Sequence, residues 1–541
     1  MRSRNKSLLA CLVVSAAIAA FGAPTPSQAQ FRANSFSVGS RAPMMNPTFR
    51  AEPRFERFNS DRLGDDIGSG KGKGKSRGNG DVATGGDDGG HGHRPSRHRQ
   101  PRPGAVIIGT GVATGVAAGV AGAAGGPPAG GSPAVARGIS IPPANENRFV
   151  KDEVLLEFAG ALPPAGIARL LGRHRLVLLE SQVFTLTNTT IVRARIVGGR
   201  AVRAVLRELR NERTLGAGQA NFIFEASQDA PPLVPPAASS ETRPEVTPVV
   251  AAASAIPAAG DPAQYVLGKL HINEAHTIAT GDKVLVAVID SGIDLSHPEL
   301  AGVVAGSFDA LGKAEKPHMH GTAIAGAIAA HARLMGAAPA AKILAIRAFG
   351  AKGNSAEATT FAILKGIDYA AQQHARIINM SFAGPTDPGL ARALAAAKQK
   401  GAVLIAASGN FGPTSPPQYP AADPHVIAVS ATDADDHIFR ASNIGPHIAV
   451  AAPGVDLLLP APNNDYQVIS GTSFSAAYVS GVAALILQRA PSLTPDGVRG
   501  VLEKTAKDLG RPGKDAEFGA GLVDAYQAIM AVQPASVSAA Q

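Results

Sequence analysis

The sequence predicts an α/β protein whose C-terminal half is a three-layer α/β/α domain built on a mostly parallel sheet. Two observations lead to this fold class. In that half, apolar runs typical of buried strands alternate with Ala-rich segments typical of helices. Ahead of it, a shorter stretch has the pattern of a small α+β domain. The chain has 541 residues and 45% are apolar, so we expect more than one core, while 60 Gly and 41 Pro indicate that part of it is not globular.

The N-terminus has the pattern of an export signal. Basic residues at positions 2, 4 and 6 precede an apolar run over 8–23, and small residues stand at 27 and 29. We therefore expect residues 1–29 to be a signal peptide and the protein to be secreted or held in the cell envelope. The single cysteine, Cys11, lies in this segment, which excludes disulfides and cysteine nucleophiles or ligands from the mature chain.

Two segments without the pattern of a folded domain follow. Residues 30–104 are rich in Gly, Arg and Lys and carry 14 basic and 8 acidic residues, so we expect a disordered spacer, with contact to an anionic surface as the alternative. No nucleic-acid-reading module accompanies them, so no specific nucleic acid is expected as partner. Residues 105–126 are uncharged and dominated by Gly and Ala. They are either a linker or a membrane segment, since their length suits a bilayer.

Residues 147–227 form the predicted small domain. Strands are expected over 154–158, 176–184, 191–197 and 220–226, and helices over 166–174 and 202–209. The order strand, helix, strand, strand, helix, strand is the ferredoxin-like arrangement, which by itself assigns no function. Residues 228–262 follow as a Pro/Ala-rich linker, extended and accessible to proteases.

The residues that carry chemistry lie within 263–533. The apolar run 284–289 is typical of a buried central strand and ends in Asp290, at the sheet edge where ligands bind in such folds. His320-Gly321-Thr322 opens one Ala-rich helix, and Gly471-Thr472-Ser473 opens another, where unpaired amides favour a polar side chain. Each feature alone is common at the ends of strands and helices, so the inference depends on their combination.

The motifs VIDSGID (288–294), HGTAIAG (320–326) and GTSFSAA (471–477) occur in this order. They resemble the active-site signatures of subtilisin-like serine peptidases, in which the order is Asp, His, Ser. The resemblance covers about residues 264–530 and extends to GAAPAAKILAIRAF, IINMSFAGP, AASGN and YPAADPHVIAVSAT. It implies a subtilisin-like three-layer α/β/α fold and a secreted serine endopeptidase that acts on proteins or peptides without a cofactor.

Carried onto this sequence, the resemblance makes Ser473 the nucleophile, His320 its general base and Asp290 the residue that orients the imidazole. The physical case agrees, because a serine hydroxyl attacks only when a base takes its proton, and that base must be held in one tautomer. His318 is the competing base, and we expect it to be a loop residue. Asn410 matches the amide of the family's oxyanion hole.

Ser381-Phe382-Ala383 stands where the family usually has Ser-Leu-Gly, a segment that pairs with the substrate backbone. Ser408 and Gly409 are expected to bind substrate with it, and the methyl group of Ala383 to narrow the pocket. Many relatives carry a calcium loop after the catalytic histidine. Here residues 331–336 offer no carboxylate or amide oxygen, so no metal site is expected.

The resemblance also gives residues 147–227 a role. They are similar to the propeptide domain of secreted zymogens, which assists folding and then occupies the active site. We expect cleavage near Ser227 or Gln228, where small residues suit a narrowed pocket. The alternative is a non-catalytic, envelope-associated binding protein that retains the fold; the presence of all three triad positions favours the enzyme.

Overall fold

The structure, a computed structural model, describes residues 138–160, 163–226, 260–313, 315–352 and 355–532. The predicted signal peptide, the basic region and the uncharged segment 105–126 lie outside the described residues, as do residues 228–259 of the predicted linker. Among the described helices, none has the length and apolar character needed to cross a membrane.

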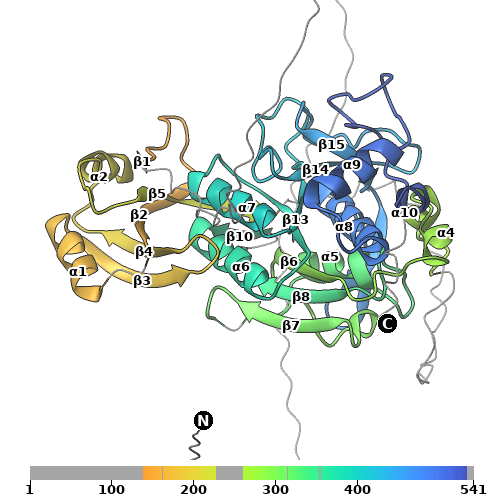
Figure 1. The fold of residues 1–541 in the computed structure, drawn as a ribbon, viewed down its shortest axis with the longest axis horizontal. Coiled ribbons are helices and arrows are strands. Elements are labelled where there is room, and N and C mark those ends of the chain that lie inside the picture. Colours follow the sequence, from red (N-terminus) through yellow and green to blue (C-terminus); the bar gives the residue numbers. More distant parts are fainter. Residues whose placement is uncertain (1–137, 161–162, 227–259, 314, 353–354, 533–541) are drawn as a thin grey trace, which may run out of the picture. The chain divides into compact units, whose positions relative to one another are not determined.

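The first described part is a small α+β unit (Figure 1). Its elements are β1 (Gly138–Ile139), β2 (Phe149–Ala159), α1 (Pro164–Arg173), β3 (Leu176–Phe184), β4 (Thr189–Ile196), α2 (Val202–Leu209) and β5 (Ala217–Ala226). The strands pair in the order β3-β4-β2-β5, all antiparallel, and the short β1 pairs with β5 in parallel. Helix α2 forms because apolar residues repeat at helical spacing, and Val202, Val205, Leu206 and Leu209 are all buried.

The second part is built on a parallel sheet of seven strands, which confirms the predicted α/β class. Its order is β15 (Ile448–Pro453), β14 (Ile427–Thr432), β13 (Val403–Ala407), β11 (Ile377–Met380), β6 (Leu285–Asp290), β8 (Lys342–Arg347) and β7 (Val304–Asp309). The central strands are buried on both faces, as their apolar runs require. Alternate β6 residues enter different cores: Val286 and Val288 one, Ala287 and Ile289 the other.

Helices cover both faces of this sheet (Figure 1). On one face lie α3 (Tyr265–Lys269), α4 (Ile272–His276), α5 (Met319–Ala329), α8 (Thr472–Arg489), α9 (Pro495–Thr505) and α10 (Ala525–Met530). On the other lie α6 (Thr360–Gln372) and α7 (Pro388–Gln399). The core on the second face continues without a break into that of the small unit.

Short elements complete the fold. They are a 3₁₀ turn, η1 (Pro298–Leu300), the strands β9 (Gly350–Lys352), β10 (Ser355–Thr359) and β12 (Phe382–Ala383), and the hairpin of β16 (Leu457–Ala461) and β17 (Asp465–Ile469). β10 and β12 both pair with β5, so the sheet of the small unit continues onto the second part.

Candidate active site

Asp290 and His320 form a buried pair. Asp290 ends β6 and His320 is the second residue of α5, and their side chains are 1% and 3% exposed. His320 Nδ1 lies 2.7 Å from Asp290 Oδ1. The same oxygen accepts hydrogen bonds from the amide of Ser291 at 2.7 Å and from its hydroxyl at 3.0 Å. An imidazole that donates from Nδ1 to a carboxylate is held in the tautomer whose Nε2 can take a proton.

Gly321 permits this close contact between α5 and β6. A Cβ at this position would lie 2.7 Å from the backbone oxygen of Ser291, so a larger residue would push the helix away. His318 instead caps α5: its Nδ1 accepts from His320 N at 3.3 Å, and its carbonyl accepts from Thr322 Oγ1 at 3.0 Å. Burial lowers the pKa of His318. The carboxylate of Asp290 therefore pairs with His320, and His318 holds the start of the helix.

Ser473 is the second residue of α8 and is fully buried. Its Oγ donates to the carbonyl of Ser381 at 3.5 Å, and Ser381 Oγ donates to the carbonyl of Ser473 at 3.0 Å. The ring of the next residue, Phe474, has its centroid 5.8 Å from that of His320. The start of α8, which carries Ser473, thus lies near the start of α5, which carries His320.

Asn410 follows β13 and is oriented by Thr472. The side-chain oxygen of Asn410 accepts from Thr472 N at 3.1 Å and from Thr472 Oγ1 at 2.8 Å. Because both bonds use the carbonyl oxygen, the amide nitrogen points the opposite way. Sequence reasoning did not single out Thr472 or Ser291, although both stand inside the motifs, directly beside Ser473 and Asp290.

Ser408 and Gly409 connect β13 to Asn410. Ser408 is fully buried, and its hydroxyl lies 3.2 Å from that of Ser442. Gly409 has a φ of 109°, which favours glycine, and its amide donates to Thr472 Oγ1 at 3.2 Å. These contacts fix the loop that carries Asn410.

The last strand of the small unit lies beside Ser381. β5 pairs antiparallel with β10 on one side and with β12 on the other. Phe382 stands opposite Ala226, and Ala383 opposite Glu225. The predicted substrate segment thus holds an extended strand in this structure, and that strand belongs to the same chain.

Phe224 anchors this strand in an apolar site. Its ring meets that of Phe382 edge-on, with centroids 5.9 Å apart. A Cβ on Gly384 would lie 2.2 Å from the Phe224 ring, so the glycine provides the space that the ring fills. Phe224 is fully buried there.

Polar side chains of β5 cap the two helices under the small unit. Gln219 Oε1 accepts from Gly389 N at 2.7 Å, at the start of α7, and Asn221 Oδ1 accepts from Phe361 N at 3.2 Å, at the start of α6. Gln219 Nε2 donates to Asp387 Oδ1 at 2.6 Å. Asp387 is fully buried, and this burial raises the pKa of its carboxyl group.

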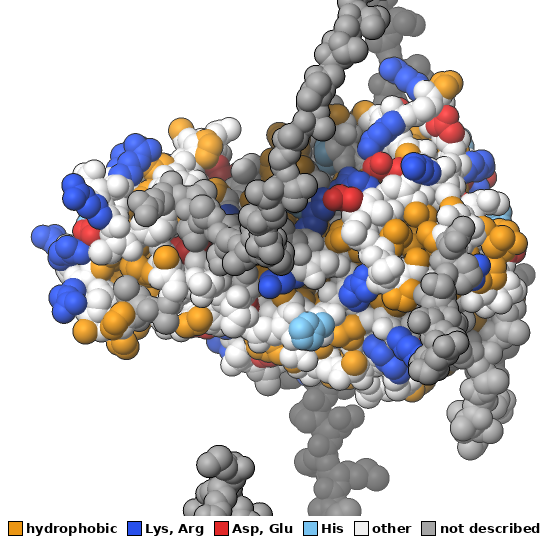
Figure 2. Space-filling view, viewed as in Figure 1, with side chains coloured by type: hydrophobic (Ala, Val, Ile, Leu, Met, Phe, Trp, Pro, Cys, Tyr) orange, Lys and Arg blue, Asp and Glu red, His pale blue; other side chains and the backbone are white. Residues whose placement is uncertain are grey.

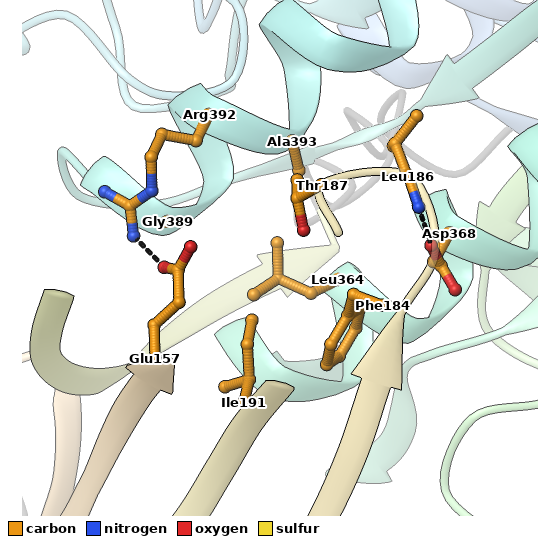
Figure 3. Close-up of a pocket in the computed structure, with 10 residues that line it drawn as sticks. All are labelled: Glu157, Phe184, Leu186, Thr187, Ile191, Leu364, Asp368, Gly389, Arg392 and Ala393. Atoms are coloured by element: carbon orange, nitrogen blue, oxygen red, sulfur yellow. Dashed lines mark hydrogen bonds and ion pairs between the residues drawn. The ribbon is translucent and has the colours of Figure 1, made fainter. Parts of the chain in front are cut away.

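A narrow crevice runs along the same contact (Figure 3). Glu157 of β2 points to Arg392 of α7 and pairs with it, and the amide of Leu186 donates to Asp368 Oδ1 of α6 at 2.7 Å. Between these polar contacts, Phe184 and Ile191 lie against Leu364; the ring of Phe184 also meets that of Phe361 edge-on, at 5.9 Å. The small unit is therefore held by apolar packing and by paired charges.

The 331–336 loop is held by the carboxylate of Glu299. The buried carboxylate of Glu299 accepts from the amides of Ala332, Arg333 and Leu334 at 2.8, 2.9 and 2.9 Å, and from the hydroxyl of Tyr466 at 2.9 Å. Across the described ranges, no group of three or more His, Cys, Asp or Glu side chains is arranged to hold a metal ion.

Comparison with known proteins shows similarity to the subtilase family. Residues 281–521 match the model of the subtilase family. The chain is 36% identical to thermitase from Thermoactinomyces vulgaris over 274 residues, which is 49% of this chain and 95% of thermitase. It is 37% identical to subtilisin E from Bacillus subtilis over 260 residues, 46% of this chain and 66% of that protein.

A solved structure shares the fold. Fervidolysin from Fervidobacterium pennivorans, described as a keratinolytic enzyme related to subtilisin, matches with a TM-score of 0.61 at 23% identity, over 74% of this chain and 64% of that one. The motif order, the Asp290–His320 pair at the sheet edge and the similarity over nearly all of thermitase lead to one assignment: the chain belongs to the subtilase family of serine endopeptidases.

Proposed function

We propose that this subtilase is exported as a precursor that cuts itself, with Ser473 as nucleophile, His320 as general base and Asp290 as the group that orients the base. The observation that carries the proposal is the buried contact of 2.7 Å between His320 Nδ1 and Asp290 Oδ1, at the edge where Ser473 lies. A histidine poised in this way is what a serine nucleophile requires.

The expected reaction has two halves. His320 Nε2 takes the proton of Ser473 Oγ as this oxygen attacks the substrate carbonyl, and Asp290 stabilises the imidazolium that forms. The imidazolium then gives its proton to the leaving amine, which leaves an acyl-enzyme on Ser473. A water molecule repeats the sequence and releases the acid. Asn410 and the amide of Ser473 would donate to the oxyanion, and the Thr472 contacts support this role for Asn410.

Residues 147–227 would serve as the propeptide. The pairing of β5 with β12 supports this, because its C-terminal end enters the site as an extended strand. Ala226 stands opposite Phe382, the residue after Ser381, whose carbonyl accepts from Ser473 Oγ. The cut would fall between Ser227 and Gln228, and residues 1–29 would direct export.

A fluorophosphonate probe, which reacts with activated serines, tests the assignment. We expect it to label Ser473 in the wild-type protein and to label neither Ser473→Ala nor His320→Ala. Hydrolysis of an unstructured protein substrate should fall by about 10⁴-fold or more in both variants. Absence of label and of hydrolysis in a folded wild-type protein freed of its small unit would favour the non-catalytic binding protein instead.

A further inference from the structure

Charge is divided unevenly between the two parts of the chain. Residues 147–226 hold twelve Arg and Lys against seven Asp and Glu, whereas residues 260–532 hold twenty against twenty-three. Eleven of the twelve cations in the small unit are arginines. Two of its acids form ion pairs with the second part: Glu157 with Arg392, and Glu180 with Lys365. The small unit thus carries five more basic than acidic residues.

This surplus gathers at one end of the small unit. Figure 2 shows Lys and Arg side chains crowded at the end that lies farthest from the second part. Here α1 ends, β3 begins and β4 ends, and we call this surface the outer end; it consists of Arg173, Arg175, Val177, Leu178, Arg195 and Val197. All three of its arginines are exposed.

The outer end also exposes apolar side chains among these cations. Val177, Leu178 and Val197 are 49%, 49% and 48% exposed. Val177 stands opposite Arg195 in the β3–β4 register, and the amide of Val197 donates to the carbonyl of Arg175. Apolar and cationic residues are thus neighbours on adjacent strands of the outer end.

The arginines of the outer end remain available to a partner. Arg175 has no ion-pair partner among the described residues, while Arg173 pairs with Glu212 and Arg195 with Asp152 only at the surface, with the arginine side chains 59% and 54% exposed. Such surface pairs contribute little free energy, so an external anion can replace them. The planar guanidinium suits phosphate oxygens in particular.

We propose that the outer end docks on an anionic lipid bilayer, with the arginines at the phosphates and Val177, Leu178 and Val197 at the boundary of headgroups and acyl chains. A soluble polyanion would use the arginines but would gain nothing from exposed valine and leucine, whereas a bilayer accepts both. If the proposed function holds, the uncut chain stays at the membrane, and cleavage after Ser227 releases residues 260–532, in which acids outnumber bases.

Binding to vesicles tests the proposal on the full chain, kept in one piece by Ser473→Ala. Vesicles of phosphatidylcholine with phosphatidylglycerol are compared with phosphatidylcholine alone by co-sedimentation. Each arginine at such a surface contributes about fivefold to binding, so Arg173→Gln, Arg175→Gln and Arg195→Gln together should weaken it roughly 100-fold. Val177→Ser, Leu178→Ser and Val197→Ser together should weaken it about tenfold or more, since each buried apolar group adds to membrane affinity.

A matched variant separates position from net charge. Lys283→Gln, Lys400→Gln and Arg511→Gln remove the same charge from exposed sites of the second part and should leave binding within about twofold. Equal loss in both charge variants would overturn the proposal, because net charge alone would then explain binding. Loss with the arginine set but not with the apolar set would also overturn it, in favour of a soluble polyanion. Each readout is independent of peptide hydrolysis, so failure of the proposed catalytic role would not affect it.

Discussion

Thr472 sets the direction of the Asn410 side chain, the proposed donor to the oxyanion. Both of its hydrogen bonds go to the side-chain oxygen of Asn410, at 3.1 and 2.8 Å. An amide nitrogen held in advance costs no reorganisation when the oxyanion forms. Asn410→Ala should therefore lower kcat by about 10²–10³ with KM little changed.

Thr472→Val offers a graded control for this prediction. It keeps the shape and the backbone amide but removes the hydroxyl donor, so kcat should fall less than in Asn410→Ala. Thr472→Ser retains the donor and should stay near wild type. Steady-state kinetics on one peptide substrate measures all three. A Thr472→Val enzyme as slow as Asn410→Ala would contradict an indirect role for the hydroxyl.

Asp387 should make the affinity of the small unit for the second part depend on pH. Burial raises the pKa of this carboxyl group, and the groups that face it, Gln219 and Thr360, are uncharged. Once β5 leaves, solvent would reach the carboxyl and its pKa would fall. The closed form then binds the proton more tightly, so acid favours it and its affinity falls as pH rises between the two pKa values. The expected change is about tenfold for each unit by which they differ.

The measurement is the dissociation of the cut small unit at several pH values. Asp387→Asn should abolish the fall in affinity with rising pH, because the amide keeps the contacts with Gln219 and Thr360 without titrating. Tighter binding at alkaline pH would count against control by Asp387.

At the scale of elements, the loop 331–336 takes its order from a carboxylate. Glu299 is fully buried and accepts three backbone amides of the loop and one tyrosine hydroxyl. Glu299→Gln replaces one of the two accepting oxygens with an amide NH2 group, and each buried N–H left without an acceptor costs about 1–3 kcal/mol. A lower melting temperature is expected, whereas the exposed Glu274→Gln should melt as wild type.

Chelation gives the complementary measurement. Because the oxygens of Glu299 are taken by N–H and O–H donors, EDTA should leave both the melting temperature and the activity unchanged. A clear fall in melting temperature in EDTA, restored by calcium, would mean that a cation contributes to the folded state by mass action.

Elements that depend on local pattern could be predicted from the sequence, and those that depend on distant pairing could not. The apolar run 284–289 predicts β6. Helix α2 is predicted by the helical spacing of its apolar residues, Val202, Val205, Leu206 and Leu209, because burial follows directly from such patterns. The pairing of β5 with β10 and β12 joins residues more than a hundred positions apart, so no local pattern encodes it. The same holds for Gln219 on Asp387 and for Glu299 on its loop.

For the proposed site, motif order predicts which residues take part but not which contacts they make. Asp290, His320 and Ser473 come from three separate elements, and only the fold brings Nδ1 of His320 to the Asp290 carboxylate. The capping role of His318 depends on where α5 begins, which the sequence pattern locates only within a few residues.

At the scale of the whole molecule, one chain supplies both an endopeptidase fold and the strand that enters its site. The small unit is held at β10, β12, α6 and α7 together. A strand held at so many points has its C-terminal end fixed against β12, and we expect a fixed end to give one cleavage position. Cleavage should therefore be uniform, not ragged.

The intact mass and N-terminal sequence of the purified protein after refolding test this account most directly. The wild-type chain should yield a product that begins at Gln228, and Ser473→Ala should remain whole under the same conditions. Cleavage of Ser473→Ala at the same bond without another protease present, or a mature wild-type chain that begins before Asn147, would contradict it.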